Sequence, residues 1–160
     1  MHYTIFDRRY SQWTLTTVRF WNPDSTYRYG LVGISSQIQI AQEFGSLEIE
    51  SPKRLTVVTS EESFQEEWFR LSTEQAPSID FGSVSVVIAE MGTQTSTGVA
   101  QITIQSAVTS TEFTEIVITS FVPGESCALD AALSTPFHIV AVESKNQILF
   151  IEQQDTVVCN

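Results

Sequence analysis

The stretch that decides the fold is Ser60–Phe81, SEESFQEEWFRLSTEQAPSIDF, which lies between two apolar segments with the composition of β-strands. Phe64, Trp68 and Leu71 follow one another at i, i+4 and i+7, the spacing of one face of an α-helix. The serine that opens the stretch is a good N-cap, and the glutamates after it complement the helix dipole. The pattern predicts an amphipathic helix over residues 61–73. Its apolar side must dock on a sheet, because so short a helix is marginal alone in water.

The rest of the sequence predicts a mainly β (α+β) fold, with strand-like segments on both sides of the helix. We expect an antiparallel sheet, either a sandwich or an open barrel, with the helix packed on it. Two hairpins are expected, with Phe113–Phe121 continuing the first as a meander. Their strand pairs are Ser83–Met91 with Gly98–Thr109, and Phe137–Val142 with Ile148–Ile151.

A change in composition predicts a boundary at Ser51-Pro52-Lys53-Arg54, a polar tetrapeptide that contains proline. Residues 1–52 are expected to form an aromatic-rich β segment packed on the main β domain, residues 53–160. Within this segment Gln37–Ile40 and Leu47–Glu50 alternate between apolar and polar residues, as strands with one wet face do.

The first thirty residues hold eight of the seventeen aromatic residues, interleaved with four arginines. Aromatic and arginine side chains concentrate at the energetic centres of interfaces, so this segment is a candidate surface for docking a protein or stacking a carbohydrate. The alternative is that these residues simply pack as strand residues on the sheet. The candidate interaction residues are Trp13, Trp21, Tyr27, Arg28 and Tyr29.

Charge and hydropathy argue against two classes of partner. The formal net charge is −11, and residues 71–160 contain ten acidic residues against Lys145 alone. Nucleic-acid binding depends on neutralising phosphates, so we expect no DNA or RNA partner, and anionic lipid would be repelled too. The longest uninterrupted apolar runs have four residues, far fewer than the roughly 20 of a membrane helix, so no membrane insertion is expected. The acidity is interpreted as a source of solubility and self-repulsion, with a basic protein partner or weak cation binding as the alternatives.

Cys127 and Cys159 are the only cysteines, and neither belongs to a CxxC motif. This spacing argues against zinc or thioredoxin-like chemistry. Three states stay open: a disulfide between the two, two free thiols, or a reactive thiol. The 37 serines and threonines, many on strand faces, favour an extracytoplasmic setting, periplasmic or cell-surface, with a cytoplasmic one as the open alternative.

Catalytic and metal-binding patterns are missing from the sequence: there is no GxSxG, no HExxH and no EF-hand loop. His2 lies at the terminus. His138 is expected on a strand face opposite Phe137 and Ile139 and is read as a polar strand residue. We therefore predict no enzyme, no cofactor and no metal. Acidic residues on the helix are interpreted as a solvated face that complements the dipole: Glu61, Glu62, Glu66 and Glu67.

From Leu55 to Ile151 the order of signals resembles the protease complex subunit PrcB family, especially its C-terminal domain. The matching pieces are Phe64-x-x-x-Trp68, Pro77-x-x-Asp80-Phe81, the strand that begins at Gly98, the turn Pro123-Gly124, and Thr135–Val140. Where the family often has two adjacent glycines, this chain has Thr97-Gly98. The resemblance implies a non-enzymatic bacterial module, exported or linked to a lipoprotein, that associates with a protease.

Within this resemblance Trp68 is expected in the core, and Asp80 is expected to accept hydrogen bonds from turn amides. The leading hypothesis is therefore an accessory module that binds another protein, a protease among the candidates, through sheet edges and loops. The alternatives are a small-ligand or carbohydrate-binding domain that uses Asp80 or His138 as polar handles, and a purely structural envelope domain.

Overall fold

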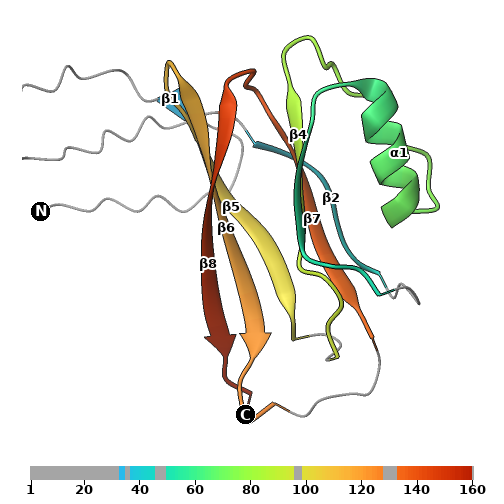
Figure 1. Ribbon diagram of the computed structural model, residues 1–160, viewed down its shortest axis with the longest axis vertical. Coiled ribbons are helices and arrows are strands. Elements are labelled where there is room, and N and C mark those ends of the chain that lie inside the picture. The colour runs from blue at the N-terminus through green and yellow to red at the C-terminus, as the bar shows by residue number, and fades with distance from the viewer. Residues whose placement is uncertain (1–32, 35–36, 46–49, 96–98, 128–132, 160) are drawn as a thin grey trace, which may run out of the picture.

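The computed structural model describes residues 33–34, 37–45, 50–95, 99–127 and 133–159, which form two four-stranded β-sheets and one helix (Figure 1). The elements in chain order are β1 (Gly33–Ile34), β2 (Gln37–Gly45), β3 (Arg54–Val58), α1 (Glu61–Leu71), β4 (Ser85–Glu90), β5 (Gln101–Thr109), β6 (Phe113–Pro123), β7 (Thr135–Val142) and β8 (Gln147–Val157).

The strands order as β1-β5-β6-β8 in one sheet, here called sheet A, and as β2-β7-β4-β3 in the other, here called sheet B. All neighbouring pairs are antiparallel except β6 and β8, which run parallel. The helix α1 covers the outer face of sheet B, so the layers are sheet A, sheet B and helix (Figure 1). The predicted mainly β fold with one packed helix is confirmed, in its sandwich form.

Helix α1 ends two residues before the predicted boundary. The side chain of Ser60 caps its N-terminus, and Ser72 has extended backbone at its C-terminus. The apolar stripe of Phe64, Trp68 and Leu71 is buried as predicted and packs on sheet B. Each such side chain contributes roughly 1.5–3 kcal/mol of hydrophobic free energy when buried. The sheet side chains of this layer are Val58, Val86, Ile88, Phe137 and Ile139.

A second core fills the space between the sheets. It is built from aliphatic side chains that alternate with those of the helix layer along β4 and β7. Every residue of β4 and of β7 is buried, because these strands have a layer on each face. The members of this inter-sheet core are Val87, Ala89, Met91, Ala100, Ile102, Ile104, Ala107, Ile116, Ile118, Val140 and Val142.

Both predicted hairpins are wrong, although the strands themselves exist. Strand β4 pairs with β3 and β7, and β5 pairs with β6, so Ser83–Met91 and Gly98–Thr109 lie in different sheets. Likewise β7 lies in sheet B, and Ile148–Ile151 belongs to β8 beside β6. The physical reason is that strands apolar on both faces must occupy central positions, which overrides pairing with the next strand in sequence.

The continuation from β5 into β6 is found as predicted, across a turn in which Ser110 N–H donates to the Phe113 carbonyl at 2.8 Å. Along β5 buried and more exposed residues alternate, since Ile102 and Ile104 are buried while Gln101 and Thr103 are partly exposed. Gln37–Ile40 belongs to β2, and Leu47–Glu50 lies almost wholly outside the described residues.

Candidate functional site

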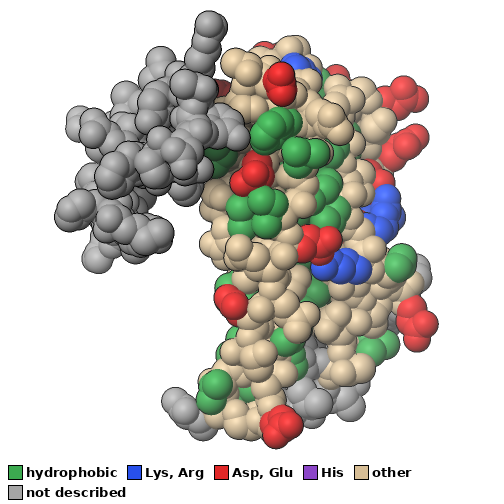
Figure 2. All heavy atoms as spheres, turned by 60° about the vertical axis from the view of Figure 1, so that its left-hand side comes forward, with side chains coloured by type: hydrophobic (Ala, Val, Ile, Leu, Met, Phe, Trp, Pro, Cys, Tyr) green, Lys and Arg blue, Asp and Glu red, His purple; other side chains and the backbone are tan. Residues whose placement is uncertain are grey.

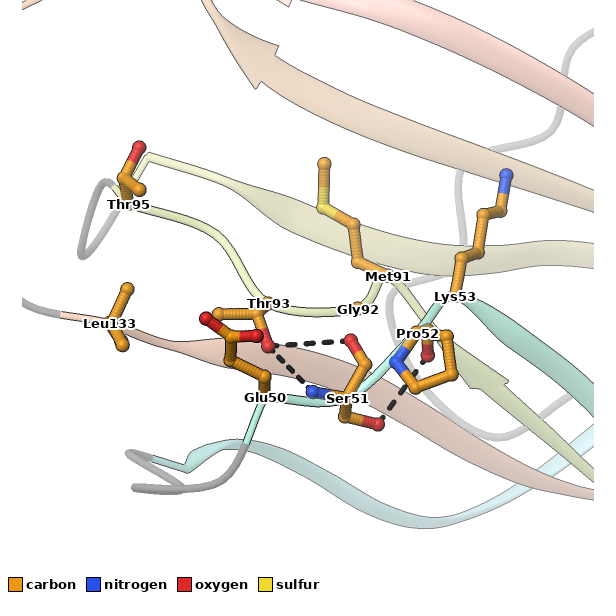
Figure 3. A pocket seen from close by; sticks show the side chains of 9 residues that line it. All are labelled: Glu50, Ser51, Pro52, Lys53, Met91, Gly92, Thr93, Thr95 and Leu133. Carbon is orange, nitrogen blue, oxygen red and sulfur yellow. Dashed lines mark hydrogen bonds between the residues drawn. The ribbon is translucent and has the colours of Figure 1, made fainter.

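A hollow lies at one end of the sandwich, where the segment before β3, the segment after β4 and the segment before β7 meet (Figure 3). It is open to solvent and has a volume of about 650 Å³. Lys53 and Met91 point the same way, away from Glu50 (Figure 3). The lining residues are Glu50, Ser51, Pro52, Lys53, Met91, Gly92, Thr93, Thr95 and Leu133.

The polar groups of this hollow are already used to hold two chain segments together. Thr93 Oγ1 accepts from Ser51 N at 2.8 Å, and Thr93 N donates to the Ser51 carbonyl at 2.9 Å. Lys53 Nζ pairs with Glu152 of β8. Gly92 has φ +80°, and a Cβ there would lie 2.7 Å from Lys53 N, so this close crossing requires glycine. These contacts fasten the end of the sandwich.

A buried carboxylate joins helix α1 to sheet B. Glu90, at the end of β4, is 0 % exposed. Its two oxygens accept from Arg70 Nη1 and Nη2 at 2.7 and 2.6 Å, and Arg54 Nη1 lies 3.8 Å away. Glu67 completes the network, because it accepts from Arg54 Nη2 at 2.7 Å and from Arg70 Nη2 at 2.7 Å. Two arginines therefore balance two glutamates.

The ion pairs of this network correct the interpretation of Glu67 as part of a solvated face of the helix. Burial alone raises the pKa of Glu67, but hydrogen bonds from Arg70 and Arg54 and their charges outweigh burial and lower it. The hydrogen bond to Glu90, against the opposing effect of burial, raises the pKa of Arg70. Glu67 is thus an ion-pair residue on the inner side of the helix, whereas Glu61, Glu62 and Glu66 are exposed as expected.

His138 is buried between the sheets, not on an open strand face. Its Nδ1 accepts a hydrogen bond from the backbone N–H of Ile104 in sheet A at 2.9 Å, next to the β-bulge of β5. Nε2 is buried without a hydrogen-bond partner among the described residues. Burial lowers the pKa of the ring, which is therefore neutral with its proton on Nε2. His138 connects the two sheets and does not reach the hollow.

The two pieces Phe64-x-x-x-Trp68 and Pro77-x-x-Asp80-Phe81, which resemble the PrcB family, lie on helix α1 and in the loop that follows it. Phe64 and Trp68 are buried, with Trp68 Nε1 donating to the Glu74 carbonyl at 2.9 Å. Phe81 packs on Phe64 with ring centroids 5.9 Å apart, and Pro77 is exposed. Asp80 accepts from Gly82 N at 2.9 Å and from Ser83 Oγ at 3.1 Å, both within its own turn. These contacts support the loop and place no group in a cavity.

Cys127 and Cys159 form a disulfide that links the loop after β6 to the end of β8. Gly124 N–H donates to the Val157 carbonyl at 2.9 Å, and Cys159 N–H donates to Ser126 Oγ at 3.1 Å. Of the three states left open by the sequence, the structure contains the bridge, so neither thiol is available for chemistry.

The remaining candidate surface is the outer edge of β8. Among the described strands β8 is the last of sheet A and has β6 on one side and no strand on the other. Its first half contains four consecutive apolar residues, of which Ile148 and Phe150 pack toward the core while Leu149 and Ile151 are 40 % and 39 % exposed. The predicted interaction residues Trp13, Trp21, Tyr27, Arg28 and Tyr29 lie outside the described residues.

The chain matches no family model, and no curated protein or solved structure is similar enough to count as a relative. The described residues hold no group of three or more metal-ligating side chains, and no helix among them is long and apolar enough to cross a membrane. The arginine–glutamate network was missed from the sequence. Its only signal was Glu90, an acid that directly follows the apolar run Val86–Ala89 of a central strand.

Proposed function

We propose that this protein is a non-enzymatic accessory module of the bacterial cell envelope that binds another protein through the open edge of β8. The binding chemistry is β-augmentation, in which an extended segment of the partner pairs its main chain with the unpaired N–H and C=O groups of an edge strand. This mode needs no catalytic side chains. The resemblance to the PrcB family supports the same class of function and makes a protease a candidate partner.

The observation that carries the proposal is a long, regular strand at the edge of sheet A with apolar residues in its first half. Natural sheets blunt their edges with charges, proline, bulges or very short strands, because an exposed apolar edge invites pairing. Strand β8 has 11 residues, pairs with β6 without a bulge over its whole length, and begins with Gln147-Ile-Leu-Phe-Ile151. None of its residues is buried. Such an edge is suited to receive a further strand.

The charge of the surface defines the partner further. Asp155 lies on β8, where Glu152 is already paired with Lys53, and the chain as a whole carries −11. An approaching strand with lysine or arginine would be attracted, and its association would weaken as salt screens the exposed charges. The partner segment is therefore extended, apolar on one face and basic. The disulfide supports a setting outside the reducing cytoplasm, where such bridges persist.

Two adjacent proline substitutions, Gln153→Pro and Gln154→Pro, test the proposal. Successive residues of a strand direct their N–H groups to opposite edges, so one substitution removes a hydrogen bond to β6 and the other removes a donor from the open edge. Thermal melting identifies which substitution removed the open-edge donor, because that variant should have a melting temperature closer to that of the parent. Gln153→Ala and Gln154→Ala are the matched controls.

The parent, both proline variants and both alanine controls are used as bait for envelope proteins of the source organism at low and moderate salt. We expect one specific protein to be captured by the parent and the alanine variants, and lost with the open-edge proline variant. Capture should be weaker at the higher salt. Capture that survives both prolines would contradict edge pairing, and capture of nothing would favour a purely structural domain.

A further inference from the structure

Part of the outer face of sheet A is apolar, although no described element covers it. Odd- and even-numbered residues of β6 face opposite sides of sheet A, so Val117 faces outward between the buried Ile116 and Ile118. The register places Val117 beside Ile151 of β8, and Glu115 beside both Leu149 and Val108. Figure 2 shows hydrophobic side chains gathered on the upper half of this face, among acidic ones. The apolar members are Val108, Val117, Phe121, Leu149 and Ile151.

The two outer faces of the sandwich therefore differ. Helix α1 covers that of sheet B and forms a core cluster with it, whereas none of the five apolar residues of the sheet A face belongs to either core cluster. Leu149 and Ile151 are exposed and Val117 beside them is half-buried. Contiguous exposed apolar side chains can mark a surface that another element or molecule covers.

The chain itself supplies a segment at the right place. Strand β1 begins at Gly33, which pairs with Thr109, and Ile34 pairs with Val108, so the described chain joins sheet A at Gly33, at the end of the apolar face. At about 3.3 Å per residue the preceding 32 residues span roughly 100 Å, whereas an 11-residue strand is about 36 Å long. The segment is long enough to cross the face twice.

Composition and charge of this segment complement the face. Residues 1–32 contain eight aromatic residues, and their four arginines and two aspartates give a net charge of +2. The face carries Glu115, which is half-buried, and Asp155, which is exposed. We propose that residues 1–32 pack across the outer face of sheet A, with their aromatic side chains on Val117, Leu149 and Ile151 and their arginines toward the two acids. The open edge of β8 is a separate surface.

Tryptophan fluorescence of the full chain tests this docking. The chain has three tryptophans, and Trp68→Phe leaves Trp13 and Trp21 as the only emitters. If the segment is docked, their emission lies at short wavelength and acrylamide quenches them weakly. Val117→Lys and Ile151→Lys, made separately in this background, should move the emission to longer wavelength and increase quenching. Phe69→Lys is the control, because Phe69 is 63 % exposed on the distant helix α1.

Several outcomes would overturn the proposal. Tryptophans as accessible in the parent as in the unfolded chain would mean that a separate partner covers the face. Quenching that increases on dilution, with a dimer in sedimentation, would mean that a second copy does. Hydrogen exchange of the unsubstituted protein is the independent check: amides of residues 1–32 should be protected in the parent and should lose that protection in Ile151→Lys.

Discussion

Strands β7 and β8 follow one another in the chain and both contain runs of apolar residues, yet they end in opposite environments. All eight residues of β7 are buried, and none of the 11 residues of β8 is. Strand β7 lies between β2 and β4, with α1 on one face and sheet A on the other, whereas β8 lies at an edge, with β6 as its only neighbour among the described strands. Packing on both faces thus holds β7, whereas β8 is held by one ladder, by Ile148 and Phe150 packed on one face, by an exposed ion pair and by a disulfide.

Two ion pairs give the sharpest contrast between these regions. Arg70→Ala should destabilise the fold by about 3–5 kcal/mol, because it leaves Glu90, beside β7, buried without its bidentate partner. Lys53→Ala should cost less than about 1 kcal/mol, because the Lys53–Glu152 pair of β8 is nearly half exposed. Urea denaturation measures both. The double variant Arg70→Leu/Glu90→Leu should recover much of the loss, and equal losses in the two single variants would contradict the comparison.

Reducing the disulfide should affect β8 before β7. Cys127 and Cys159 are 32 residues apart in sequence, and closing a loop of that size stabilises a fold by about 3–4 kcal/mol in the chain-entropy model. We expect reduction to lower the melting temperature, and hydrogen exchange to accelerate mainly in β8. Cys127→Ala/Cys159→Ala should match the reduced protein. Mass spectrometry of protein purified without reductant from an oxidising compartment should find the two thiols linked, and two free thiols there would argue against the bridge.

Identical isoleucine truncations compare the packing of the two strands directly. Ile139→Ala in β7 should cost about 3 kcal/mol, because Ile139 is completely buried in the helix layer and its removal leaves a cavity. Ile151→Ala in β8 should cost less than about 1 kcal/mol from the fold of the described residues. Chemical denaturation gives both values, provided that the free energy of unfolding depends equally steeply on denaturant concentration in the two variants. A loss at Ile151 as large as that at Ile139 would contradict the comparison.

The smallest effect is expected from the titration of His138 in β7. Burial keeps its folded-state pKa below the unfolded value of about 6.5, and Nδ1 accepts from Ile104 N–H. Its contribution to stability is therefore complete above about pH 6.5 and is lost as the pH falls from there toward the folded-state pKa. The measurement is the free energy of unfolding from pH 8 to pH 5 for the parent and for His138→Gln. The variant should lack this part of the pH dependence, and identical profiles would show that His138 does not titrate on unfolding.

Local signals were enough to predict the helix and the existence of the strands. The spacing of Phe64, Trp68 and Leu71, the cap at Ser60 and the alternation in Gln101–Gln105 all depend on neighbours in sequence, so the residues themselves specify them. The same holds for Asp80, whose hydrogen bonds stay within its own turn. The cysteine pair was one of three open states, because sequence spacing says nothing of distance in space.

What the sequence alone determined is a mainly β chain with one docked helix, an acidic surface and two cysteines near its end. Strand pairing was decided only by the tertiary structure, because β4 and β7 can bury both apolar faces only in the centre of sheet B, which separates each from its neighbour in sequence. The same packing placed Glu90 against Arg70 and His138 against Ile104, contacts between residues 20 and 34 positions apart. It also left β8 at an edge of the described sheet. The sequence could not predict this position, because periodicity reports which side of a strand is buried and not what lies beside it.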